Sequence, residues 1–147
     1  MKKTLFLRSE LTNQVIEGQP VITVTLTGDD ILDVCLSLCL LRDDLVSELV
    51  LRSKQMGLCL EQSANYDENW LVRSPSFVRV QLTVIELERL VDFFLRYYRD
   101  GVAEVDHLDI EARENVPGQL DAYVTLVVPN YLPPVPSEEA KRKLGIE

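Results

Sequence analysis

One local pattern occurs twice in this chain, at residues 22–31 and 78–87. In each copy an alternating apolar segment ends at a threonine, and an acid follows three residues later. The pairs Thr27/Asp30 and Thr83/Glu86 have the form of an N-terminal helix capping box. The repeat therefore predicts two strand-then-helix halves, and it carries no information about chemistry.

The chain is large enough for one domain, and its net charge limits its partners. Its 147 residues suffice for one domain with a hydrophobic core and are too few for two domains of ordinary size. A formal net charge of −9 repels nucleic-acid phosphates and anionic lipids, so both are disfavoured as partners. The first apolar stretch stops at Arg8, too short for a signal peptide, and no segment has the length of a membrane span. We expect a cytoplasmic protein.

Hydrophobic periodicity predicts a single α+β domain with a mainly antiparallel sheet and helices packed on one side. The alternation at Ile22, Val24 and Leu26 is typical of a strand, and the one-sided apolar stripe after Thr83 is typical of a helix that ends at Gly101. The expected helices span 28–41, 45–56 and 84–100, and the expected strands span 4–8, 14–17, 21–26, 58–62, 70–73, 77–82, 102–113 and 120–128.

The segment 31–41 is apolar around almost its whole circumference. Such a segment is either a helix buried on several sides or a buried strand, and the acids after Thr27 favour the helix. Leu32, Leu36 and Leu40 lie away from the face that would cover the sheet. They predict an interaction surface, and with it a homo-oligomer, most simply a homodimer.

The C-terminal residues differ in character from the rest of the chain. Four prolines between Pro129 and Pro136 forbid regular structure, and a short terminal helix is expected after Ser137. We therefore divide the chain into a globular domain, 1–128, and a proline-rich arm, 129–147. Within the arm, Tyr131 and Leu132 are further candidates for the interaction surface.

Metal-ligating and catalytic residues are sparse. Cys35, Cys39, Cys59 and His107 could formally form a zinc set, but their spacing does not match structural zinc motifs, and the cysteines are expected to be small buried side chains. The odd cysteine count argues against a disulfide framework. His107 is flanked by acids and could act as a general base or a metal ligand. Alternation instead predicts it on the exposed face of a strand, with no paired nucleophile. We assign no catalytic, cofactor-binding or metal-binding residue.

Trp70, Arg73 and Arg79 lie on neighbouring predicted strands. Aromatic and arginine side chains on a sheet can bind a protein or stack on the bases of single-stranded nucleic acid, and tryptophan is also common in cores. The sequence also lacks the glycine-rich loops that bind phosphate groups.

These observations favour a small acidic, non-enzymatic binding, adaptor or regulatory protein that acts through protein–protein contacts. The alternative is a small hydrolase or metal-dependent enzyme centred on His107 and its neighbouring acids. A weaker alternative is a single-stranded nucleic-acid binder that uses Trp70, Arg73 and Arg79.

Overall fold

The computed structural model describes residues 2–8, 11–63, 68–101, 105, 107–114, 121–128 and 145. The chain order of its elements is β1(Lys2–Phe6), β2(Leu11–Ile16), β3(Gln19–Thr25), α1(Gly28–Arg42), β4(Glu48–Arg52), β5(Gly57–Gln62), β6(Trp70–Arg73), β7(Phe77–Leu82), α2(Val84–Asp100), β8(His107–Glu114) and β9(Asp121–Val127). The predicted arm, with Tyr131 and Leu132, lies outside the described residues apart from Gly145.

The described strands form a single nine-stranded sheet in the order β1-β4-β5-β7-β6-β8-β9-β3-β2. Four strand pairings are antiparallel, and each joins the two strands of a hairpin. The other four are parallel: β1 with β4, β5 with β7, β6 with β8, and β9 with β3. The predicted fold class is therefore wrong, because the sheet is mixed and the described residues include two helices rather than three.

A helical crossover accounts for one of the parallel pairings. A hairpin, a helix and a second hairpin follow one another twice along the chain. The hairpins β6–β7 and β8–β9, which α2 joins, meet through the parallel pair β6–β8, because a helical crossover returns the chain in the same direction. The hairpins that α1 joins do not meet, since β3 pairs with β9 and β4 pairs with β1 and β5. The sequence predicts both strands of three hairpins but not β4, and it does not predict the edges at which the hairpins meet.

The predicted helix at 45–56 is a strand in the structure. Leu49, Val50 and Leu51 are all buried: Leu49 and Leu51 belong to the core, and Val50 lies on the opposite face of the sheet, where β4 is flanked by β1 and β5. A short continuous apolar run is the signature of such a strand. By contrast, residues 31–41 are helical, within α1.

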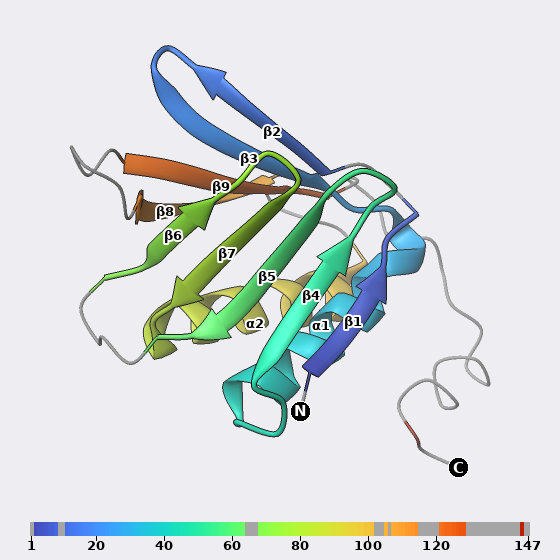
Figure 1. Cartoon of the computed structure of the whole chain (residues 1–147). Helices are drawn as coiled ribbons and strands as arrows, with labels where there is room; N and C mark the ends of the chain where they lie inside the picture. The colour runs from blue at the N-terminus through green and yellow to red at the C-terminus, as the bar shows by residue number, and fades with distance from the viewer. Residues whose placement is uncertain are drawn as a thin grey trace.

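Both helices lie behind the sheet in Figure 1 and contact each other there. α1 also contacts β1, β4 and β5. One hydrophobic core joins the helices to the strands on both sides of the β6–β8 pairing. That pairing spans only two residue pairs, and the strands on either side of it run in clearly different directions in Figure 1.

The two predicted helix caps differ. The Oγ1 atom of Thr83 accepts a hydrogen bond from the backbone N–H of Glu86 at 3.1 Å, as a cap requires. Thr27 makes no such bond, and its Oγ1 instead donates to Asp30 Oδ2 at 3.1 Å. The prediction of equivalent caps is therefore wrong at Thr27.

The cap at Thr83 leads to the first testable prediction. Thr83→Ala should lower the free energy of unfolding by about 1 kcal/mol, because the amide of Glu86 loses its acceptor. Thr83→Ser keeps the hydroxyl and should retain most of the stability. Urea denaturation of the three proteins measures both effects, and equal loss in the two variants would contradict the cap.

Candidate functional site

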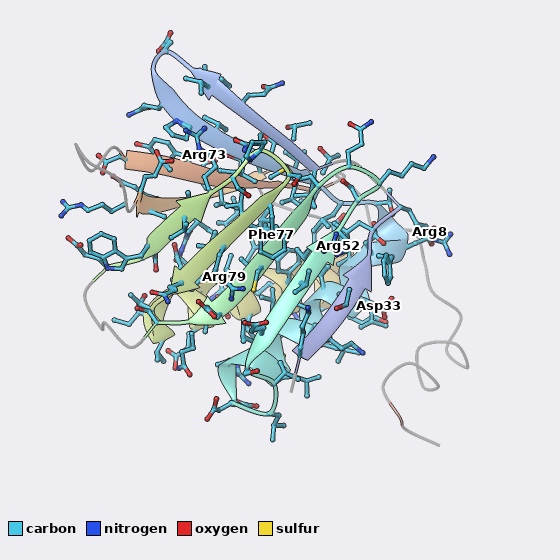
Figure 2. All side chains as sticks on the ribbon, in the orientation of Figure 1. Arg8, Asp33, Arg52, Arg73, Phe77 and Arg79 are labelled. Carbon is cyan, nitrogen blue, oxygen red and sulfur yellow. The ribbon has the colours of Figure 1, made fainter. Side chains whose placement is uncertain are left out.

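The face of the sheet opposite the helices is the candidate functional site, and we call it the open face. On β4, β5, β6 and β7 alternate side chains point away from the helices, which lie behind the sheet in Figure 1; Figure 2 shows Arg52, Phe77 and Arg79 on the near side. It consists of Glu48, Val50, Arg52, Gly57, Cys59, Glu61, Trp70, Val72, Phe77, Arg79 and Gln81.

A cluster of ionic groups lies at the centre of the open face. The Nη1 atom of Arg79 lies 2.8 Å from Glu48 Oε1, 3.1 Å from Glu61 Oε2 and 3.5 Å from Cys59 Sγ. Gln81 also donates to Glu61, at 3.1 Å. The hydrogen bond from Arg79 lowers the pKa of Glu48, and Glu48 in turn raises the pKa of Arg79.

The same cluster contains a possible set of metal ligands. Ligand atoms of Glu48, Cys59 and Glu61 all lie within 4.8 Å of one another. The Arg79 guanidinium already supplies a cation at this position and hydrogen-bonds all three side chains. The arrangement is therefore an arginine held by two carboxylates, and a metal ion would have to displace it.

Phe77 lies between two arginines on the open face. The Cζ atoms of Arg52 and Arg79 are 6.0 and 5.9 Å from the centroid of its ring, within the range of cation–π attraction. The ring lies over Gly57, where a Cβ atom would come within 2.9 Å of Phe77 Cδ2. The missing side chain at Gly57 thus makes room for the aromatic ring. Figure 2 shows Arg52, Phe77 and Arg79 over neighbouring strands.

A second arginine–aromatic pair extends the surface across β6. Arg113 Cζ, on β8, lies 6.0 Å from the centroid of the Trp70 ring, and Trp70 is half-buried. Arg113 Nη1 also lies 3.6 Å from Glu68 Oε1. Trp70 and Arg79 lie on the neighbouring strands β6 and β7, and both are on the open face.

Arg73 does not belong to this surface. It pairs with Val78 in the β6–β7 register, so its side chain points to the same face as the core residue Val78. There its Nε donates to Glu114 Oε1 at 3.0 Å, and the Glu114 side chain is only 4% exposed. Arg73 thus neutralises a buried carboxylate.

The structure separates the remaining candidate surface residues from the open face. Leu32 is buried in the monomer, and Leu36 and Leu40 are half-buried, all on α1 behind the sheet. Tyr131 and Leu132 lie outside the described residues. The eight predicted residues therefore do not form one surface within the part of the chain that the structure describes.

His107 lies at the start of β8 with an exposed side chain, as the alternation predicted. Its Nε2 is 3.7 Å from Asp109 Oδ2, while Thr125 Oγ1 donates to Asp109 Oδ1 at 2.7 Å. A nucleophilic hydroxyl must be bonded to the imidazole, with the carboxylate on the far side of the ring. Here the carboxylate lies between the hydroxyl and the imidazole, so the three groups do not form a catalytic triad.

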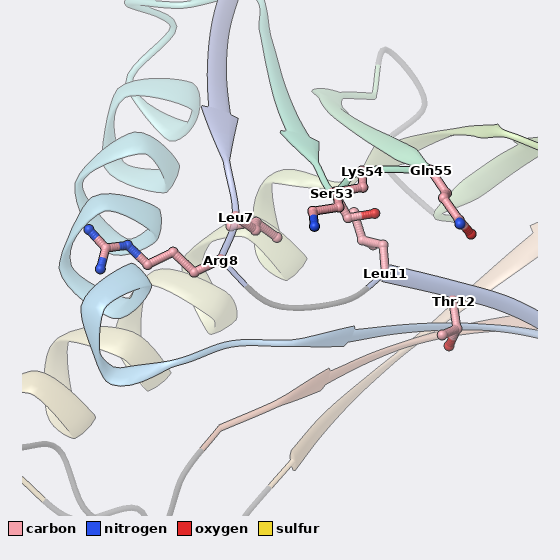
Figure 3. Close-up of a pocket in the computed structure, with 7 residues that line it drawn as sticks. All are labelled: Leu7, Arg8, Leu11, Thr12, Ser53, Lys54 and Gln55. Atoms are coloured by element: carbon pink, nitrogen blue, oxygen red, sulfur yellow. The ribbon is translucent and has the colours of Figure 1, made fainter.

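One pocket lies where β1, β2 and the turn between β4 and β5 come together. Its volume is about 380 Å³, and it is lined by Leu7, Arg8, Leu11, Thr12, Ser53, Lys54 and Gln55 (Figure 3). Arg8 extends toward α1 and pairs with Asp29 at 3.2 Å. The lining contains no group of acids, bases and nucleophiles that converge on one point.

Comparisons with known proteins do not place the chain in a family. No family model and no curated protein matches it. Among solved structures, the crystal structure of Drosophila Suppressor of Fused is similar, with a TM-score of 0.43 and 12% sequence identity over 84% of this chain and 28% of that one. The chain thus spans little more than a quarter of that protein, and a likeness of this size carries no argument about function. Neither α1 nor α2 is both long and apolar enough to cross a bilayer.

Sequence analysis missed Glu48, Arg52, Glu61 and Phe77. Glu48 and Arg52 lie in the segment 45–56, which the sequence analysis predicts as a helix, so their place on a sheet was not predicted. Their alternation with Leu49 and Leu51 would have placed them on one face of a strand.

The cysteines provide a second testable prediction. Burial raises the pKa of Cys35 to about 12 and that of Cys59 to about 11, so both are neutral thiols at about pH 8. Ellman's reagent should label the folded protein mainly at the half-buried Cys39, and should label all three cysteines in guanidinium. Cys39→Ser should remove the labelling of the folded protein, whereas fast labelling of Cys59 would contradict its burial.

The bond between Arg79 and Glu48 provides a third prediction. Because the folded-state pKa of Glu48 lies below its ordinary value of 4.5, the bond stabilises the fold above that pH and its contribution is lost as the pH falls through the folded-state pKa. The wild-type protein should therefore lose free energy of unfolding between about pH 6 and about pH 3, and Glu48→Gln should lose less of it. Because the pair is accessible to solvent, the two proteins should differ in this loss by less than about 1 kcal/mol.

Arg79→Met should reduce this pH dependence by a similar amount, and the double variant should add little. An unchanged pH dependence in Glu48→Gln would contradict the assignment.

Proposed function

We propose that this chain is a small acidic, non-enzymatic binding protein that acts through protein–protein contacts, with the open face as its docking surface. Three arginine–aromatic contacts carry the proposal: Arg52 and Arg79 with Phe77, and Arg113 with Trp70. Tryptophan, tyrosine and arginine dominate the binding energy of protein interfaces, and phenylalanine is enriched there.

The surface also has the electrostatic character of a protein interface. Arg79 is already paired with Glu48 and Glu61, so it offers little free positive charge to a phosphate backbone. Together with the net charge of −9, this disfavours the nucleic-acid alternative. The preorganised pairs present planar side chains that lose little conformational entropy on docking.

The enzyme alternative has weaker support. It depends on His107 and the neighbouring Asp109. The Asp109 carboxylate accepts a hydrogen bond from the Thr125 hydroxyl, so it does not orient the imidazole toward that hydroxyl. If an activity is found for this protein, His107→Ala should leave it largely intact.

Site-specific photo-crosslinking tests the proposal and gives the fourth prediction. A photoreactive residue at Val72, which is 50% exposed on the open face, should form covalent adducts with a protein partner in cells. The same residue at Ile85, which is 75% exposed on α2, is the matched control and should not. Mass spectrometry identifies the partner.

The binding constant of the identified partner then measures the contribution of the aromatic residues. Trp70→Ala and Phe77→Ala should each weaken binding by about tenfold or more, whereas Leu95→Ala on α2 should have little effect. Melting temperatures verify that the variants remain folded. Equal crosslinking from Ile85, or binding that does not depend on Trp70 and Phe77, would contradict the proposal.

A further inference from the structure

The two edges of the sheet differ in how they are protected. β1 forms one edge and carries Lys2 and Lys3, a common device against unwanted strand pairing. β2 forms the other edge, and its six residues, Leu-Thr-Asn-Gln-Val-Ile, include no charge and no proline. Within the described residues no strand pairs with the outer side of β2, and no charge on it opposes the addition of a further strand.

The hairpin that carries this edge is well defined and accessible. β2 and β3 are joined by Glu17 and Gly18, whose φ angles of 52° and 81° are typical of a type I′ turn, the turn whose twist matches that of two paired strands. The hairpin extends past its neighbours at the top of Figure 1. Near its tip, Val15 is 61% exposed and Ile16 is 50% exposed.

An unsatisfied polar atom lies in the middle of this edge strand. Asn13 Oδ1 is buried and has no hydrogen-bond partner within the described residues. The amide nitrogen of the same side chain makes a long bond of 3.4 Å to the carbonyl oxygen of Ser74. Buried acceptors are rarely left unpaired, so this atom indicates a donor from outside the described residues.

We propose that β2 pairs with β2 of a second copy of this chain, antiparallel and in a register centred on Asn13. About a two-fold axis perpendicular to the sheet, this register sets Leu11 beside Val15 of the second copy, and Thr12 beside Gln14. Asn13 then lies beside its own equivalent, whose side-chain amide is a suitable donor for Oδ1. Over residues 11–15 of each copy, apolar residues meet apolar residues and polar residues meet polar ones.

The sequence of the edge favours a second copy over an unrelated strand. Two chains of net charge −9 repel each other over most of their surfaces, and an uncharged segment is where they approach at least cost. A register centred on Gln14 would instead place Asn13 beside Val15 and leave Oδ1 without a donor. Because one strand edge buries little area, we expect a dimer that dissociates in the micromolar range.

Sedimentation velocity on the full chain tests the dimer. The mass should rise from 16.8 kDa toward twice that value between about 5 and about 200 µM. Val15→Lys should keep the protein monomeric across the range, because it places a charge at the pairing edge. Val72→Lys replaces a valine on the open face and should leave dimerisation unchanged. A monomer at every concentration, or a dimer insensitive to Val15→Lys, would overturn the proposal.

Disulfide formation tests the register. Asn13→Cys should give a covalent dimer under mild oxidation about tenfold faster than Gln14→Cys, because only residue 13 lies directly opposite itself. The reverse order would overturn the register centred on Asn13. These results are independent of the open face, so this proposal and the docking proposal can fail separately.

Discussion

The packing of α1 and α2 against one face of the sheet determines where the other side chains lie. Once that face is committed to the core, every second residue of β4, β5, β6 and β7 must point to the opposite side. Those positions carry the arginines, acids and aromatic rings of the open face, with Val50 and Cys59 buried beneath them. The helices thus determine the composition of the face that they do not contact, because they bury the apolar residues of the other face and leave this one for polar and aromatic side chains.

The sequence predicts the parts of this fold that depend on neighbours in the chain. β7 and α2 follow from alternation, from the cap at Thr83 and from the stop at Gly101, all of which are local. The parallel edges between hairpins are long-range pairings without a local signal. β4 is a different case: Leu49, Val50 and Leu51 are three apolar residues in a row, and such a short run does not by itself distinguish a buried strand from a helix.

The candidate site was partly predictable by the same logic. Trp70 and Arg79 lie on the same face, and the alternation of β6 already separates Arg73 from Trp70 because the two are an odd number of residues apart. The ion pair of Arg73 with Glu114 could not be predicted, since it depends on the pairing of β6 with β8. Equally, the contact of Phe77 with Gly57 requires the register of β5 and β7.

The two proposals have a geometric consequence when they are taken together. A two-fold axis perpendicular to the sheet keeps equivalent faces on the same side, so pairing of β2 strands would extend the sheet without covering the open face. Each dimer would then present two open faces in one direction. A partner with repeated binding sites would engage both, and the second contact would form at a high effective concentration. A modest affinity at each open face would thereby become a strong attachment without any further contact surface.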